Sequence, residues 1–175
     1  NPVTQLFQEV AANFQHSPII GWAFDGNPIY GPYGYIDPTD QNSGVRRMRT
    51  SFKLKENVVF DAATNPNPSR VDGPPIATYA AGTFIDDYYY NFQSGDLDNY
   101  NGRFCKTPDF PDGVYAYFIT IDASDAGIPE FPYIMGPQFN SLPDNWNFSQ
   151  EATQENIPSG VVRYRDPYTD VDIDV

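Results

Sequence analysis

Few side chains in this sequence are suited to nucleophilic catalysis or to soft-metal binding. His16 is the only histidine and Cys105 the only cysteine among 175 residues. This count excludes a multi-histidine zinc site and an internal disulfide. A Ser-His-Asp or Cys-His system would have to use His16. We expect a hydrogen-bonded structural histidine and a buried cysteine, while a ligand role for His16 and a pairing with Cys105 stay open.

A group of oxygen-bearing side chains forms a candidate metal site. Asp96, Asp98 and Asn101 follow closely after Asp86 and Asp87. Calcium prefers hard oxygen ligands of this kind, but the spacing lacks the glycine and the later glutamate of an EF-hand loop. The pattern indicates either a calcium site or a solvated acidic turn, and we expect no other cofactor.

Tyrosines near these acidic residues form a candidate sugar-binding surface. Their rings offer flat faces to a saccharide, although alternating tyrosines in a strand also pack within a sheet. Both interpretations stay open for the four residues Tyr88, Tyr89, Tyr90 and Tyr100.

Two Asp-Gly pairs could supply carboxylates for hydrolysis. General acid and base catalysis needs two carboxyl groups that face one substrate, and the pairs are Asp25-Gly26 and Asp112-Gly113. Asp before Gly is also typical of tight turns, because the aspartate bonds to nearby backbone and glycine accepts a positive φ. We favour turns, predict no catalytic residue, and expect the chain not to be an enzyme.

The composition predicts a mainly β fold. Tyrosine and phenylalanine number 13 each, and such rings suit a pleated sheet. Seventeen prolines and 13 glycines interrupt long helices. We therefore expect a compact antiparallel β sandwich or barrel-like domain with long ordered loops and at most one or two short helices.

Hydrophobic periodicity and turn residues place the expected elements along the chain. The sequence predicts a helix over 3–14, strand-turn-strand over 16–35, strands with a basic face over 46–61, a surface loop over 62–75, strands over 84–92 and 114–121, an apolar run over 131–135, an irregular arm over 140–160, and a last strand over 161–164. We treat 1–175 as a single domain with a helix or linker at 1–15, a core at 16–137 and an arm and strand at 138–175. Both ends suggest a segment of a longer protein.

The net charge of −13 disfavours nucleic acid as a partner, because the surface would repel phosphates. No run approaches the roughly 20 apolar residues of a membrane span, so we expect no membrane partner either.

Three blocks carry a family resemblance: HSPIIGWAFDGNPIYGPYGY at 16–35, DLDNYNGRFCKTPDFPDGVYAYFIT at 96–120, and FPYIMGP at 131–137. Together they resemble the YHYH domain, in the form that occurs in virion structural proteins of tailed bacteriophages (tail, baseplate or fibre proteins, as in cyanophages). The resemblance implies a compact β-rich domain. The naming tetrad falls on 115–118, where Ala116 and Phe118 replace both histidines, so no role of those histidines carries over.

The blocks also suggest which residues build the motif. We expect these to be structural: His16, Trp22, Asp25, Gly26, Pro28, Tyr30, Gly31, Tyr33, Asn101, Gly102, Tyr115, Tyr117, Phe131, Pro132 and Tyr133. We predict a core made of Trp22, Phe24, Ile29, Tyr30, Tyr115, Tyr117, Phe131 and Tyr133.

The resemblance implies a virion structural module that stabilises the particle or presents loops to the host surface. Expected partners are other virion proteins, further copies of the chain, and a host-surface glycan, and the expected location is the extracellular particle. The alternative is an exported carbohydrate-binding or metal-dependent enzyme domain.

Overall fold

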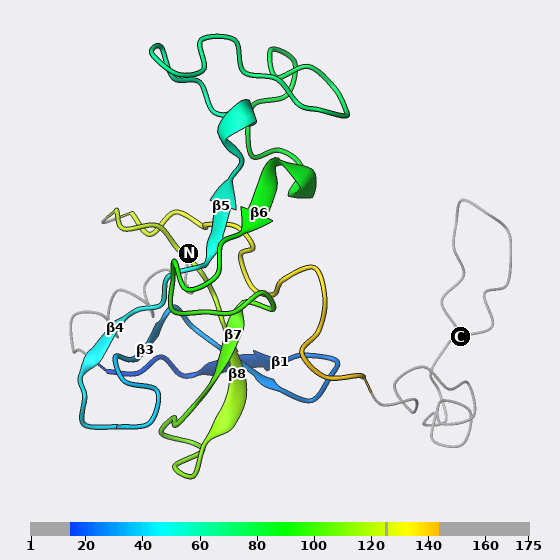
Figure 1. Cartoon of the computed structure of the whole chain (residues 1–175). Helices are drawn as coiled ribbons and strands as arrows, with labels where there is room; N and C mark the ends of the chain where they lie inside the picture. Colours follow the sequence, from blue (N-terminus) through cyan, green and yellow to red (C-terminus); the bar gives the residue numbers. More distant parts are fainter. Residues whose placement is uncertain (1–14, 125, 144–175) are drawn as a thin grey trace, which may run out of the picture.

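The computed structural model describes residues 15–124 and 126–143, and it is mainly β as expected (Figure 1). The predicted helix at 3–14, most of the arm at 140–160 and the strand at 161–164 lie outside these residues. Within the described part, no helix has the length and apolar character needed to cross a bilayer.

A four-stranded sheet organises the fold. Its order is β1 (Ile19–Trp22), β2 (Pro28–Tyr30), β8 (Val114–Phe118) and β7 (Gly102–Cys105). β1 and β2 form an antiparallel hairpin, as do β7 and β8, and β2 pairs with β8 in parallel. The sheet therefore brings the block at 16–35 against the block at 96–120, across more than 80 positions of sequence.

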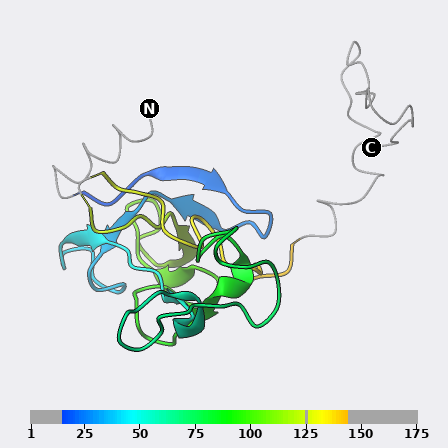
Figure 2. The same cartoon turned by 90° about the horizontal axis from the view of Figure 1, so that it is seen from above.

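Two small antiparallel sheets accompany it. β3 (Tyr33–Tyr35) pairs with β4 (Val45–Arg47), and β5 (Phe52–Leu54) pairs with β6 (Tyr88–Tyr90). Two 3-10 turns, η1 (Glu56–Val58) and η2 (Ile85–Asp87), bound the long connection between β5 and β6, so the strand expected over 84–92 is shorter than predicted. We call residues 55–87 the β5–β6 loop; Figures 1 and 2 both place it away from β1.

The core covers one face of the four-stranded sheet. The register pairs Tyr30 with Phe118 and Cys105 with Val114, which places these side chains on a common face. Fully or almost fully buried residues form the cluster: Tyr30, Met48, Leu97, Cys105, Ala116 and Phe118. Burial of the larger apolar side chains among these stabilises a fold by about 1.5–3 kcal/mol each.

The predicted core was wrong at three aromatic residues. Trp22 is 59% exposed, Phe24 is 62% exposed and Tyr133 is 46% exposed. Trp22 ends an edge strand, Phe24 lies in the turn that follows, and Tyr133 lies in a turn at a φ of 71°. Neighbouring strands cover one side of an edge strand at most, so the aromatic content of a block does not by itself imply burial.

The remaining predicted core residues are more enclosed. Tyr30, Tyr117 and Phe131 are buried, while Ile29 and Tyr115 are half-buried. Phe131 stacks on Tyr88 with ring centroids 4.0 Å apart, which joins the third block to the small β5–β6 sheet.

Candidate functional site

Strand β8 carries the tetrad and presents it on two faces. The alternation of a strand places Tyr115 and Tyr117 on one face and Ala116 and Phe118 on the other. Ala116 and Phe118 are fully buried and belong to the core cluster, whereas the two tyrosines point to the opposite side of the sheet. Ala116 and Phe118, which the resemblance places where the family has histidines, are therefore core residues in this chain.

Each tyrosine of the tetrad donates a hydrogen bond to an aspartate outside β8, one from the first block and one from an earlier part of the same block. The Tyr117 hydroxyl lies 2.6 Å from Oδ2 of Asp25, and the Tyr115 hydroxyl lies 3.0 Å from both carboxylate oxygens of Asp98. The two rings meet edge to face with centroids 5.3 Å apart. Hydrogen bonds to ionised groups are among the stronger ones in proteins, so these pairs tie the β1–β2 turn and the 96–101 turn to β8.

The protonation states support this arrangement. Burial, together with the neighbouring Asp98 and Asp25 carboxylates, raises the pKa values of Tyr115 and Tyr117. Burial alone would raise the pKa of Asp25, but hydrogen bonds from Tyr117 and Asn27 outweigh it and hold that pKa below its usual range. At neutral pH the tyrosines are therefore donors and Asp25 is an ionised acceptor. These hydrogen bonds stabilise the fold.

Asn101 and Gly102 close this network. Asn101 has a φ of 63° and is fully buried, and its amide donates to the carbonyls of Phe118 and Ile134. A Cβ on Gly102 would lie 2.4 Å from the Tyr115 hydroxyl, so a larger residue would displace that ring. Asn101 thereby joins the second block to the third.

The three predicted calcium ligands have different partners in the structure. The Asp96 side chain is 4% exposed and ion-paired with Arg46 and Arg49. Asp98 accepts from Tyr115, and the Asn101 amide nitrogen donates to two carbonyls, while its Oδ1 is buried with no hydrogen-bond partner in the described part of the chain. Within residues 15–124 and 126–143, no group of three or more His, Cys, Asp or Glu side chains could hold a metal ion. Calcium binding here stays a prediction, and it would require Asp96 to release two guanidinium groups.

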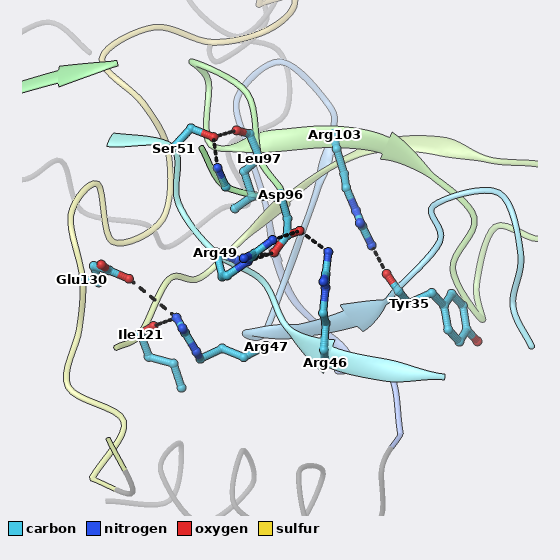
Figure 3. Close-up of polar contacts among 11 residues, drawn as sticks. Tyr35, Arg46, Arg47, Arg49, Ser51, Asp96, Leu97, Arg103, Ile121 and Glu130 are labelled. Carbon is cyan, nitrogen blue, oxygen red and sulfur yellow. Dashed lines mark hydrogen bonds and ion pairs between the residues drawn. The ribbon is translucent and has the colours of Figure 1, made fainter. Parts of the chain in front are cut away.

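An arginine cluster surrounds Asp96 (Figure 3). Arg49 Nε lies 2.9 Å from Oδ2 of Asp96, and Arg46 binds Oδ1. Burial would raise the Asp96 pKa, but the hydrogen bonds and charges of Arg49 and Arg46 outweigh it and lower the pKa. A Cβ on Gly95 would lie 2.3 Å from the carbonyl oxygen of Thr50, so this chain crossing requires glycine. The cluster holds residues 94–98 against 49–51.

The predicted tyrosine surface is divided by the β6 pleat. Tyr88 stacks on Phe131, and Tyr90 packs edge to face on Phe52 with centroids 5.7 Å apart. Tyr89 is 41% exposed on the other face, and Tyr100 is half-buried in a turn. The four rings therefore do not share one exposed face.

His16 lies against the core face beside the tetrad strand. Its ring contacts Tyr30, Tyr35 and Phe118, with centroids 5.0, 4.8 and 5.9 Å away. Nδ1 lies 2.8 Å from the Ser17 carbonyl oxygen, which accepts only from a protonated nitrogen. Burial lowers the His16 pKa, so the ring is neutral at pH 7 and Nε2 carries a lone pair.

Nε2 of His16 is buried and has no hydrogen-bond partner in the described part of the chain. An unpaired buried polar atom costs about 1–3 kcal/mol. The Cys105 thiol is also buried in the core, and burial raises its pKa, so it is a poor nucleophile.

A cavity of about 730 Å³ lies beside His16. Its lining comes from segments far apart in sequence, and the polar or aromatic members are Gln15, His16, Ser17, Tyr35, Gln41, Asn42 and Asp109. Sequence reasoning identified His16 but missed the other members, because no local motif joins residues 16, 35, 41 and 109. Only the path of the chain brings them together.

Comparison with known protein families finds one family for most of the chain. The family described as YHYH protein matches residues 2–126, about 70% of the chain. The chain belongs to the YHYH protein family. No curated protein and no solved structure matches it. Within this YHYH protein, the matched range includes both tetrad tyrosines and their aspartate partners, and the block at 131–137 lies beyond it.

Proposed function

We propose that this YHYH protein is a structural module of a tailed-bacteriophage virion, within a tail, baseplate or fibre component. It stabilises the particle and presents the β5–β6 loop to a neighbouring virion protein or to the host surface. The resemblance of the three sequence blocks to the phage members of the family supports the virion assignment. One observation supports the proposal that the β5–β6 loop is presented to a partner.

That observation is the internal anchor of the β5–β6 loop. Figure 1 shows the loop extending beyond β5 and β6, away from the four-stranded sheet. Arg70 forms two bonds to Asp87, at 2.6 and 2.8 Å, and both side chains are almost fully buried. Arg70 also donates to the carbonyls of Pro74, Tyr79 and Ala80. A long loop held by one central guanidinium keeps a defined shape, which is what a recognition loop on a rigid scaffold needs.

The loop also carries exposed apolar side chains. Val71 is 89% exposed and Phe60 is 65% exposed. The exposed large hydrophobic residues of the loop are Val59, Phe60, Val71, Tyr79 and Ile85. Exposed apolar residues on an ordered projection are the kind of feature that an interaction surface uses. We assign the partner contact to this surface.

The first experiment asks whether the polypeptide is part of the particle. Phage particles purified by density gradient should contain peptides of this chain in stoichiometric amounts by mass spectrometry. Particles that contain none of it would refute the virion assignment.

The second experiment tests the loop in the assembled particle. Phe60→Ser together with Val71→Ser removes two exposed apolar groups, so the melting temperature should stay unchanged while assembly or host adsorption falls about tenfold, the loss expected from about 1.4 kcal/mol of binding energy. Leu142→Ser is the matched control, because Leu142 is 95% exposed outside the loop. Normal assembly and adsorption of the double variant would refute the role of the loop.

A further inference from the structure

The cavity beside His16 has the composition of a small-ligand site. Its volume of about 730 Å³ lies within the roughly 300–1,000 Å³ of known ligand pockets. We propose that this cavity binds a neutral pyranose sugar, with the Tyr35 ring as its flat wall and Asp109, Gln41 and Asn42 as partners for the sugar hydroxyls. The inference rests on the proposed function, in which the module contacts host-surface glycans, and it identifies the cavity beside His16 as the place where a glycan would bind.

The flat wall is held in place from behind. Arg103 Nη2 donates to the Tyr35 carbonyl oxygen at 2.6 Å, and the Tyr35 ring packs against His16 at a tilt of 54°. Figure 3 shows the Tyr35 ring directed away from the arginine cluster. A fixed aromatic ring offers a sugar ring an apolar surface with little loss of conformational entropy.

The polar lining presents acceptors and donors on supported side chains. Oδ2 of Asp109 accepts a hydrogen bond from the Tyr30 hydroxyl at 3.0 Å, which fixes the carboxylate. Gln41 Nε2 donates to the Thr107 carbonyl oxygen at 2.8 Å and leaves its Oε1 as an acceptor. Asn42 is exposed and lines the cavity, so its side-chain amide lies within reach of a ligand. Several oriented polar groups on an aromatic wall are what a polyol requires.

The charge of the lining selects a neutral ligand over an acidic one. Asp109 is the only acidic residue among the described lining residues, and none of those residues is lysine or arginine. An acidic sugar would place a second negative charge near Asp109, and no lysine or arginine of the described lining balances it; Arg103 lies behind Tyr35, outside the lining. We therefore expect uronic acids to bind less well than uncharged sugars.

His16 borders the site with its ring. The ring lines the cavity, and the bond from Nδ1 to Ser17 makes Nε2 an acceptor. His16 is also the only histidine of the chain, so its ring gives a single imidazole signal that reports on the cavity.

The test is a nitrogen-15 NMR titration of the full 175-residue chain. The probes are D-glucose, D-galactose and N-acetyl-D-glucosamine, with D-glucuronate as the acidic comparison. We expect at least one neutral sugar to shift the His16 ring signals saturably, and glucuronate to bind about tenfold more weakly. No shift with any neutral sugar up to about 50 mM, well above the millimolar range of weak sites, would refute the inference.

Variants tie the signal to the cavity. Asn42→Ala and Tyr35→Leu should each weaken binding about fivefold or more, the loss of one hydrogen bond or of the flat wall. Asn91→Ala is the matched control, an exposed asparagine outside the cavity lining, and it should bind like the parent chain. If Asn42→Ala and Tyr35→Leu both bound sugar with the affinity of the parent chain, the sugar would bind elsewhere and this site would be refuted.

The two proposals fail in different ways. Particles that contain the chain while the isolated chain binds no sugar would refute the cavity and leave the structural module intact. Sugar binding by a chain that is missing from particles would refute the virion assignment and leave the cavity intact.

Discussion

Removal of one hydroxyl group tests whether the tetrad tyrosines are structural. Tyr117→Phe keeps the ring, which is buried, but removes the donor to Asp25 at 2.6 Å and the acceptor for the Asn140 amide at 2.7 Å. A hydrogen bond to a charged group contributes about 1.5–3 kcal/mol. We expect the free energy of unfolding at pH 7 to fall by about that amount.

The pH dependence gives this prediction its sign. The folded-state pKa of Asp25 is depressed, so its contribution is present above the unfolded pKa, about 3.9, and is lost as the pH falls through the folded value. The stability difference between the parent chain and Tyr117→Phe should therefore be full at pH 7 and shrink below about pH 3.9.

Denaturant unfolding at pH 7 and at pH 3 measures both effects. Tyr89→Phe is the matched control, because Tyr89 is 41% exposed, and its free energy of unfolding should change by less than about 0.5 kcal/mol. A loss at Tyr117→Phe no larger than at Tyr89→Phe, or a loss that does not change with pH, would refute the structural role of the Tyr117–Asp25 pair.

Three further predictions concern the core, the turns and His16. Phe118 is fully buried and Trp22 is 59% exposed, so Trp22→Ala should lower the free energy of unfolding by less than about 1 kcal/mol and Phe118→Ala by about 3–5 kcal/mol. Denaturant unfolding measures both losses, and the reverse order would contradict the fold. Gly26→Ala should lower the free energy of unfolding by about 1–2 kcal/mol, because the φ of Gly26 is 82° and the space around it is open. Gly95→Ala should lower it by more, because the new Cβ would meet the backbone of Thr50. Equal losses would argue against the chain crossing at Gly95. The His16 pKa measured by NMR should lie below 6.5, and a pKa above 6.5 would contradict the burial of this ring. Because the folded state then resists protonation, the free energy of unfolding should rise with pH between the folded and the unfolded pKa of His16, by up to about 1.4 kcal/mol per pH unit.

Turn chemistry and strand alternation were readable along the chain. Gly26 and Gly113 follow aspartates in turns and have φ values of 82° and 107°, and the alternating residues after Gly113 form β8. These features depend on residues within a few positions of one another. The mainly β class follows from the same local signals.

Burial and pairing between blocks were not readable in the same way. Trp22 and Tyr30 both lie in the block at 16–35, yet one is 59% exposed and the other fully buried, because β1 is an edge strand and β2 is central. Asp96 resembled a metal ligand until the fold placed Arg46 and Arg49 beside it, about 50 positions away in sequence. Strand order and charge pairing depend on the path of the whole chain.

The sequence by itself therefore determined the β class, the turns and the family, since each depends on local residue types or on a recognisable series of blocks. Only the tertiary structure decided that the tetrad tyrosines bind Asp25 and Asp98, that Arg70 anchors the β5–β6 loop, and that His16 borders a cavity. Those contacts join residues from separate elements, and no local spacing specifies which elements become neighbours.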